Sequence, residues 1–251
     1  MYPSGDATFS FKMYIGYPLP IQLPIKIDQV ESVVLEKENP SDIFDPKWKL
    51  TLHFGPVESI EKVDALAAKV VFPLLDKLAF ALDTRIFDIA LTGHGLSPKP
   101  GEGGNLHIIL PMLFVTGTVS CGVKSLTEED ISLIAKDLDE ATHKHNILLR
   151  LYHYALNIDN STLQFMVLYM LVYEIFGNQK KIDEFIKGKF PTPLLSYTDQ
   201  SGKTWPTETT YTRLRNQLTH RPDVDIKATE DEILGIIDQF RHIVREAIKS
   251  L

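Results

Sequence analysis

The stretch YTRLRNQLTHRP, residues 211–222, gathers polar side chains near the end of one predicted helix. At about 100° per residue, one side of this helix is apolar and consists of Tyr211, Leu214 and Leu218. The opposite side, spread over roughly 140°, consists of Arg215, Asn216, Thr219 and His220. We therefore expect the apolar side to dock into a helical core and the polar side to face a cleft or a partner.

A proline fixes where this helix ends. Pro222 disfavours helical geometry at Arg221, so the helix should end at His220. A cation at the C-terminal end of a helix is stabilised by the helix dipole, which would raise the affinity of the imidazole for a proton.

Arg215 and His220 together could act on a phosphodiester. The guanidinium of an arginine offers a planar fork of donors that fits two phosphate oxygens. Histidine moves protons near neutral pH, and the amide of Asn216 could hold either group or a phosphate oxygen. RNA supplies its own nucleophile, the 2′-hydroxyl, so this chemistry requires no metal. The alternatives are an ordinary solvated helix face and a histidine that only caps its helix.

The residues around this helix predict a four-helix arrangement in which it is the third helix. The first helix should start at Thr127, with Asp130 completing a capping box, and the second, residues 160–177, is apolar almost all round. An apolar helix of that kind must be central in a bundle, and Gly177 should end it. A connection with one short helix follows, and the last helix should begin at a capping box of Thr229 and Glu232.

Residues 1–122 read as a β-rich mixed segment. Period-2 alternation or apolar runs predict strands at residues 7–15, 30–38, 48–54, 85–93 and 105–121. Residues 59–82 have helical periodicity, with Pro73 expected to kink or end the helix. The prolines near residues 18–24 suit a sheet edge or an irregular approach to the sheet, and not a central strand. The fold class is thus α+β, with a β-rich domain at 1–122, expected to have a sensing or regulatory role, and an all-α four-helix domain at 123–251.

Composition excludes several classes of protein. The net charge is −7, which argues against a broad basic surface that coats nucleic acid. A single cysteine, Cys121, excludes a disulfide framework and a cysteine-based zinc site, and His143 and His145 lack a convergent third ligand. With no apolar run of roughly 18 residues and no basic leader, we expect a cytoplasmic protein without membrane association and without a metal or cofactor. Nothing in residues 1–122 positively indicates an enzyme site there.

The string RLRNQLTH, residues 213–220, resembles the Arg–polar–x3–His motif of HEPN domains. The longer string ETTYTRLRNQLTHRPDVDI, followed by the helix TEDEILGIIDQFRHIVREAI, is similar to the methylamine-utilisation J-type proteins and the ApeA-like HEPN group. This resemblance covers residues 126–251.

The resemblance implies metal-independent endoribonuclease activity in a homodimer whose two motifs face each other, with roles in toxin or phage-defence systems. It implies catalytic roles for Arg215, Asn216 and His220. We expect RNA contacts from the polar and basic neighbours Thr219, Arg213, Arg221 and Lys203, and an antitoxin or regulatory partner is a further expectation. Because the family includes members without nuclease activity, the alternative is a non-catalytic module for dimerisation or ligand binding.

Overall fold

The computed structural model describes residues 2–16, 21–23, 29–39, 41, 45–97, 124–125, 143–190, 194–198, 202, 204–220 and 225–251. The chain divides into two compact units, Met1–His153 and Tyr154–Leu251, which are treated separately below. The α+β class is confirmed. The expected domain boundary at residues 122 and 123 lies outside the described residues.

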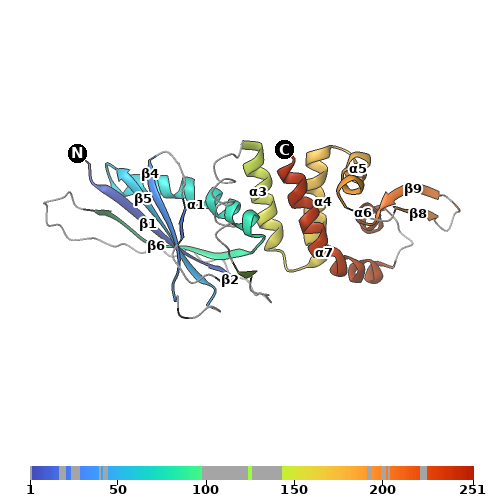
Figure 1. Ribbon diagram of the computed structural model, residues 1–251, viewed down its shortest axis with the longest axis horizontal. Coiled ribbons are helices and arrows are strands. Elements are labelled where there is room, and N and C mark those ends of the chain that lie inside the picture. The colour runs from blue at the N-terminus through green and yellow to red at the C-terminus, as the bar shows by residue number, and fades with distance from the viewer. Residues whose placement is uncertain are drawn as a thin grey trace. The chain divides into compact units, whose positions relative to one another are not determined.

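An antiparallel sheet of five strands forms the centre of the first unit (Figure 1). In spatial order its strands are β3 (Ile21–Leu23), β4 (Val30–Lys37), β5 (Lys47–Pro56), β1 (Ser4–Met13) and β6 (Ile86–Ser97). Four of the expected strands are confirmed, and β3, which lies among the prolines, is an edge strand as expected. The expected strand at 105–121 falls outside the described residues, and β2 (Ile15–Gly16) pairs with β7 (Lys124–Ser125).

Helix α1 (Ile60–Leu82) packs against β1 and β6 and buries its apolar side. Ser59 caps its start, and it ends at Asp83 in a left-handed conformation with φ of 49°. The helix continues past Pro73, so the expectation that this residue could end it is not met. Buried residues on both sides of the proline, such as Val71 and Leu74, hold the helix together despite the lost backbone hydrogen bond.

The first unit also contains most of α3 (His143–Leu156), which is anchored by polar contacts. His153 Nδ1 lies 2.8 Å from Asp76 Oδ1 on α1, and its Nε2 lies 2.9 Å from the carbonyl oxygen of Ile86. Tyr152 donates a hydrogen bond of 2.6 Å to Asp83. The expected start of this helix at Thr127 lies outside the described residues.

The second unit is built around α4 (Ser161–Phe176) and α7 (Ile226–Lys249). Their shared core contains an aromatic cluster of Phe165, Tyr169, Tyr211 and Phe240. Gly177, with φ of 77°, ends α4 as expected. Burial all round α4 is not observed, because one side exposes Leu163, Met170 and Tyr173.

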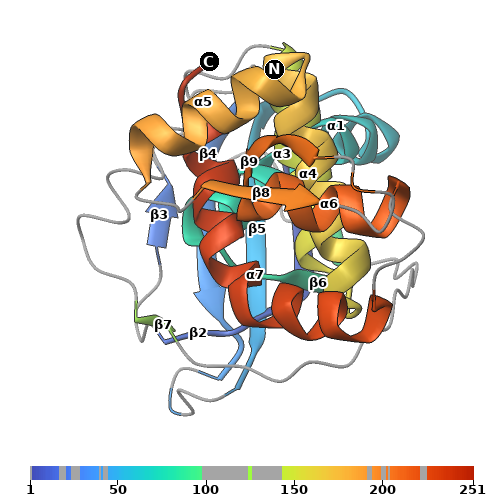
Figure 2. The same ribbon diagram turned by 90° about the vertical axis from the view of Figure 1, so that its right-hand side faces the viewer.

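Two features of the second unit differ from expectation. Between α5 (Gln179–Lys189) and α6 (Thr210–His220) lies an antiparallel hairpin of β8 (Leu194–Thr198) and β9 (Thr204–Thr209), so this unit is not all-α. Figure 2 shows the hairpin beside α6. Helix α7 is capped by Asp225, whose side chain accepts from the backbone N–H of Ala228, and not by Thr229. Thr229 instead lies buried in the first turn and donates to the carbonyl of Asp225.

Candidate functional site

Helix α6 is fixed at its start by a carboxylate from another helix. Asp183 Oδ1, on α5, accepts hydrogen bonds from the backbone N–H of Thr209 at 3.2 Å, from its hydroxyl at 2.6 Å and from the hydroxyl of Thr212 at 2.7 Å. Thr209 is the last residue of β9, and its hydroxyl also accepts from the backbone N–H of Thr212. A negative charge at a helix N-terminus is favourable, so α5 and β9 together set the position of α6.

The apolar side of α6 packs as the sequence predicts. Tyr211 and Leu214 are buried, and the ring of Tyr211 stacks on Phe240 with 4.9 Å between the ring centroids. Burial raises the pKa of Tyr211 to about 12, because the phenolate would be poorly solvated there. Leu218 is partly buried.

Arg215 follows Leu214 on α6, is partly buried and has two defined contacts. Its Cζ is 5.8 Å from the centroid of the Tyr169 ring, a cation–π arrangement. Its Nη1 donates a hydrogen bond of 2.9 Å to Asn216 Oδ1. In the part of the chain that the structure describes, no other acceptor is hydrogen-bonded to this guanidinium, which has five N–H donors.

Tyr169 connects this ring contact to the start of α6. The hydroxyl of Thr212 donates to Asp183, so the hydrogen bond of 3.0 Å between Tyr169 and Thr212 must be donated by the tyrosine. Burial raises the pKa of Tyr169 to about 12; the carboxylates of Asp183 and Glu208 raise it too, while the Thr212 bond and the charge of Arg215 lower it. Tyr169 is therefore a neutral donor at ordinary pH.

Asn216 is held by two further side chains. Its Nδ2 donates to Glu208 Oε2 at 2.7 Å and lies 3.4 Å from Gln179 Oε1. Gln179 Nε2 lies 3.4 Å from the same oxygen of Glu208. Glu208, on β9, is only 2% exposed. The amide that the sequence offered as a substrate contact is thus engaged inside the protein.

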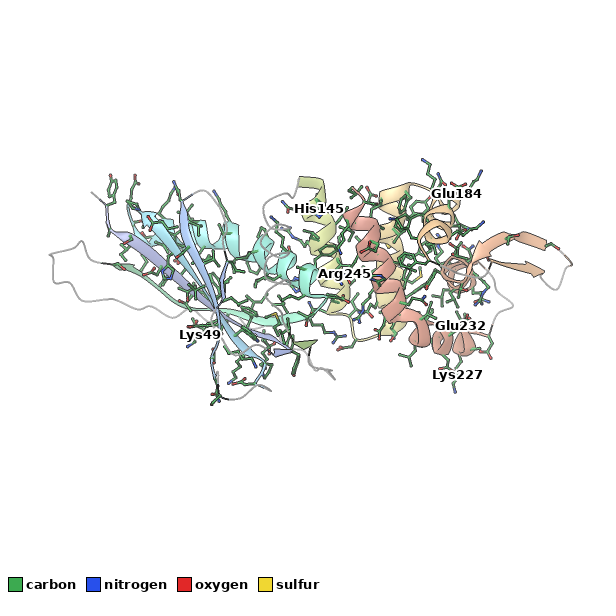
Figure 3. All side chains as sticks on the ribbon, in the orientation of Figure 1. Lys49, His145, Glu184, Lys227, Glu232 and Arg245 are labelled. Carbon is green, nitrogen blue, oxygen red and sulfur yellow. The ribbon has the colours of Figure 1, made fainter. Side chains whose placement is uncertain are left out.

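The remaining predicted residues fall into three groups. Thr219 is exposed beside Arg215, and its hydroxyl donates to the carbonyl of Arg215. Arg213 points elsewhere: its Nη2 pairs with Glu232, and its Nη1 donates to Gln217 at 2.8 Å. Glu232 lies on α7, where Figure 3 labels it. The Arg213 side chain is only 14% exposed, and its contact with RNA stays a prediction. His220 is the last residue of α6, as expected; its side chain, Lys203 and Arg221 lie outside the described part.

Sequence reasoning missed the residues that support Arg215. Tyr169 lies in the helix that the sequence predicts at residues 160–177, but the sequence gives no sign that its ring contacts the guanidinium. Glu208 and Gln179 come from β9 and α5, and neither lies within the Arg–polar–x3–His motif. The sequence held one signal for Glu208: it lies two positions before the first residue of α6, and the helix dipole favours a negative charge there.

The chain matches no protein with which it was compared, and its described residues contain no metal site and no membrane-spanning helix. No protein-family model, no curated protein and no solved structure matches the chain. Among the described residues, no three histidine, cysteine, aspartate or glutamate side chains are grouped so that they could hold a metal ion. Within the same residues, no helix has both the length and the apolar character needed to span a bilayer.

The geometry on α6 favours binding of an anion. An arginine whose guanidinium is held through one nitrogen, and which lies on an aromatic ring, keeps its other donors for an incoming ligand. The side chain is partly buried, so its electrostatic interactions are stronger than those of a fully exposed arginine. A phosphate or carboxylate group is the ligand that such a planar fork fits best.

Proposed function

We propose that this protein is a metal-independent endoribonuclease of the HEPN type. The observation that carries the proposal is the Arg215 guanidinium, which is held through Nη1 and has no other hydrogen-bonded acceptor among the described residues. This arginine lies five residues, about 1.4 helical turns, before His220, the last residue of the same helix. The resemblance of residues 213–220 to the HEPN motif supports the same assignment.

The reaction would proceed by attack of the ribose 2′-hydroxyl on the adjacent phosphorus. The hydroxyl proton passes to a base, a P–O2′ bond forms, and the P–O5′ bond breaks as the 5′-oxygen takes a proton from an acid. His220 supplies the proton transfer, and Arg215 stabilises the charge on the phosphoryl oxygens. The products are a 2′,3′-cyclic phosphate and a 5′-hydroxyl.

A homodimer would complete this site. One motif offers one arginine and one histidine, whereas the reaction profits from a base, an acid and a clamp on the phosphate. An isologous two-fold interface beside His220 would bring two copies of the motif together. The specific cleavage rate should then fall on dilution below the dimer dissociation constant, as followed by light scattering. A monomer with a concentration-independent specific rate contradicts the shared site.

The test of the proposed reaction uses purified full-length protein with matched RNA and DNA oligonucleotides. RNA should be cut in the presence of a chelator, DNA should remain intact, and the cut ends should carry a 2′,3′-cyclic phosphate or its hydrolysis product. Loss of activity in chelator, restored by magnesium or manganese, would indicate a different chemistry.

A second candidate function is a non-catalytic module for dimerisation. The observation that favours it is the exposed apolar side of α4, with Leu163, Met170 and Tyr173, because such surfaces often lie in interfaces. Under this alternative the protein associates and binds RNA or another anion without cutting it. Tight RNA binding together with intact RNA after prolonged incubation, at every protein concentration, would favour it over the nuclease.

A further inference from the structure

A buried carboxylate lies two side chains away from the candidate phosphate-binding arginine. Glu208 Oε2 accepts from Asn216 Nδ2 at 2.7 Å, and Asn216 Oδ1 accepts from Arg215 Nη1 at 2.9 Å. Glu208 lies at the end of β9, whereas Asn216 and Arg215 are neighbours on α6. The three side chains form one hydrogen-bonded series that runs from a buried anion to a partly exposed cation.

The polarity of this series defines which way the Asn216 amide faces. A carboxylate only accepts hydrogen bonds and a guanidinium only donates them, so the amide NH2 must face Glu208 and the amide oxygen must face Arg215. The flipped amide would place an oxygen against the carboxylate and an NH2 group against the guanidinium. Glu208 therefore selects the amide orientation that Arg215 requires.

Burial of the Glu208 carboxylate is unfavourable for folding if the carboxylate is charged. Burying a carboxylate is unfavourable unless hydrogen bonds and an opposite charge compensate it. The amides of Asn216 and Gln179 donate hydrogen bonds to the Glu208 carboxylate. Within the series, the opposite charge is that of Arg215, which is bonded to Asn216. An apolar residue would fill the same place at lower cost if the only requirement were to pack β9 against α6.

We infer that Glu208 is a positioning residue for Arg215, acting through Asn216. The inference rests on the proposed function, in which Arg215 binds the phosphate that is attacked. Glu208 fixes the amide, the amide holds Nη1, and the remaining guanidinium donors keep one direction toward the phosphate. Asn216 is accordingly a link inside the protein and not a substrate contact.

The first experiment compares Glu208→Ala with Glu208→Gln. Alanine removes the acceptor and frees the amide to flip, so the cleavage rate at saturating RNA should fall on the order of 10²-fold. Glutamine can turn its amide oxygen to the same donors, so Glu208→Gln should retain activity within about threefold. Thermal melting of each variant shows whether the fold survives. Equal activity of Glu208→Ala and the wild type overturns the inference.

The second experiment reverses the polarity of the series. Asn216→Asp keeps the shape but places a carboxylate oxygen against Glu208, so cleavage should fall on the order of 10²-fold. Adding Glu208→Gln supplies an NH2 donor to the new carboxylate and should recover at least tenfold of that loss. In the matched control, Glu232→Gln is added to Asn216→Asp. Glu232 pairs with Arg213, which lies on α6 like Asn216 but outside the series, so this substitution should recover none of the lost cleavage rate. Equal rescue by both second substitutions contradicts the series.

A readout without RNA separates this inference from the proposed function. The side-chain ¹⁵N signals of Arg215 should report a restrained guanidinium in the wild type and in Glu208→Gln, and free rotation in Glu208→Ala. If the wild type does not cleave RNA but these signals behave as described, the nuclease assignment fails and the positioning role stands. If Glu208→Ala leaves the Arg215 signals unchanged, the positioning role fails whatever the protein does to RNA.

Discussion

The guanidinium of Arg215 lies over the ring of Tyr169, while the hydroxyl of the same tyrosine is bonded to Thr212 one turn earlier on α6. One buried side chain of α4 thus contacts two successive turns of the candidate site helix. Among the aromatic residues of α4, Phe165 and Tyr169 are buried in the core, whereas Tyr173 is exposed. The support of Arg215 is therefore internal to the unit.

Replacing Arg215 by lysine should cut RNA cleavage severely, by about 10²-fold or more. Lysine keeps the charge but cannot give a phosphate two parallel hydrogen bonds, and it cannot stack flat on Tyr169. Single-turnover cleavage assays measure the effect. A full rate in Arg215→Lys would mean that the residue serves only as a charge.

His220→Ala should abolish cleavage with little change in thermal stability. General acid–base groups contribute roughly 10²–10⁴ in rate. His220 is the terminal residue of α6, and helix ends fray, so a substitution there costs the helix little stability. Cleavage rate and melting temperature are measured on the same preparation. Undiminished cleavage by the alanine variant removes His220 from the mechanism.

Asp183→Ala should destabilise the second unit by roughly 2–4 kcal/mol. The substitution removes one oxygen that accepts from the Thr209 backbone, the Thr209 hydroxyl and the Thr212 hydroxyl, leaving donors at the start of α6 unsatisfied. The matched control is the neighbouring Glu184→Ala, which loses a contact of 3.9 Å between exposed side chains and should change stability by less than about 0.5 kcal/mol. Urea unfolding of both variants tests the difference, and equal midpoints contradict it.

Stability should fall between about pH 10 and pH 12 through the buried tyrosines. In the unfolded chain Tyr169 has its ordinary pKa of 10.0, whereas in the folded protein burial raises the pKa to about 12. The unfolded state therefore releases a proton first, and the free energy of unfolding falls by about 1.4 kcal/mol per pH unit within this window. Below pH 10 this contribution is fully present.

The variant Tyr169→Phe tests how much of this pH dependence comes from the ionisation of Tyr169. It keeps the ring under Arg215 and removes the titrating hydroxyl, so the dependence of unfolding free energy on pH should become shallower between pH 10 and pH 12. Chemical denaturation at a series of pH values gives both slopes. Parallel slopes for the variant and the wild type would show that Tyr169 does not carry the effect.

The elements that the sequence predicts well are those with strong periodicity. Alternation defines β1, β4 and β5, and the glycine after residue 176 defines the end of α4. The start of α7 is wrong by four residues because Asp225 and Thr229 are both good caps, and the earlier one lets another turn form.

The hairpin was missed for a physical reason. Its strands are only 5 and 6 residues long, the second contains Pro206, and polar turn residues separate them, so the local pattern indicates a loop. Glu208 reaches Asn216 because β9 ends where α6 begins. That contact depends on the hairpin, and so the motif alone could not indicate it.

The hydrogen bond of 2.7 Å between Asn216 Nδ2 and Glu208 Oε2 limits which residues can replace this pair in related sequences. A carboxylate facing an amide and an amide facing a carboxylate are compatible pairs, whereas two carboxylates repel each other. Among relatives that keep Arg215, Glu with Asp should therefore be avoided at these two positions, whereas Glu with Asn, Gln with Asn and Gln with Asp are compatible. The extended signature Glu–x6–Arg–Asn–x3–His would then distinguish chains with this hairpin from those that share only the shorter motif.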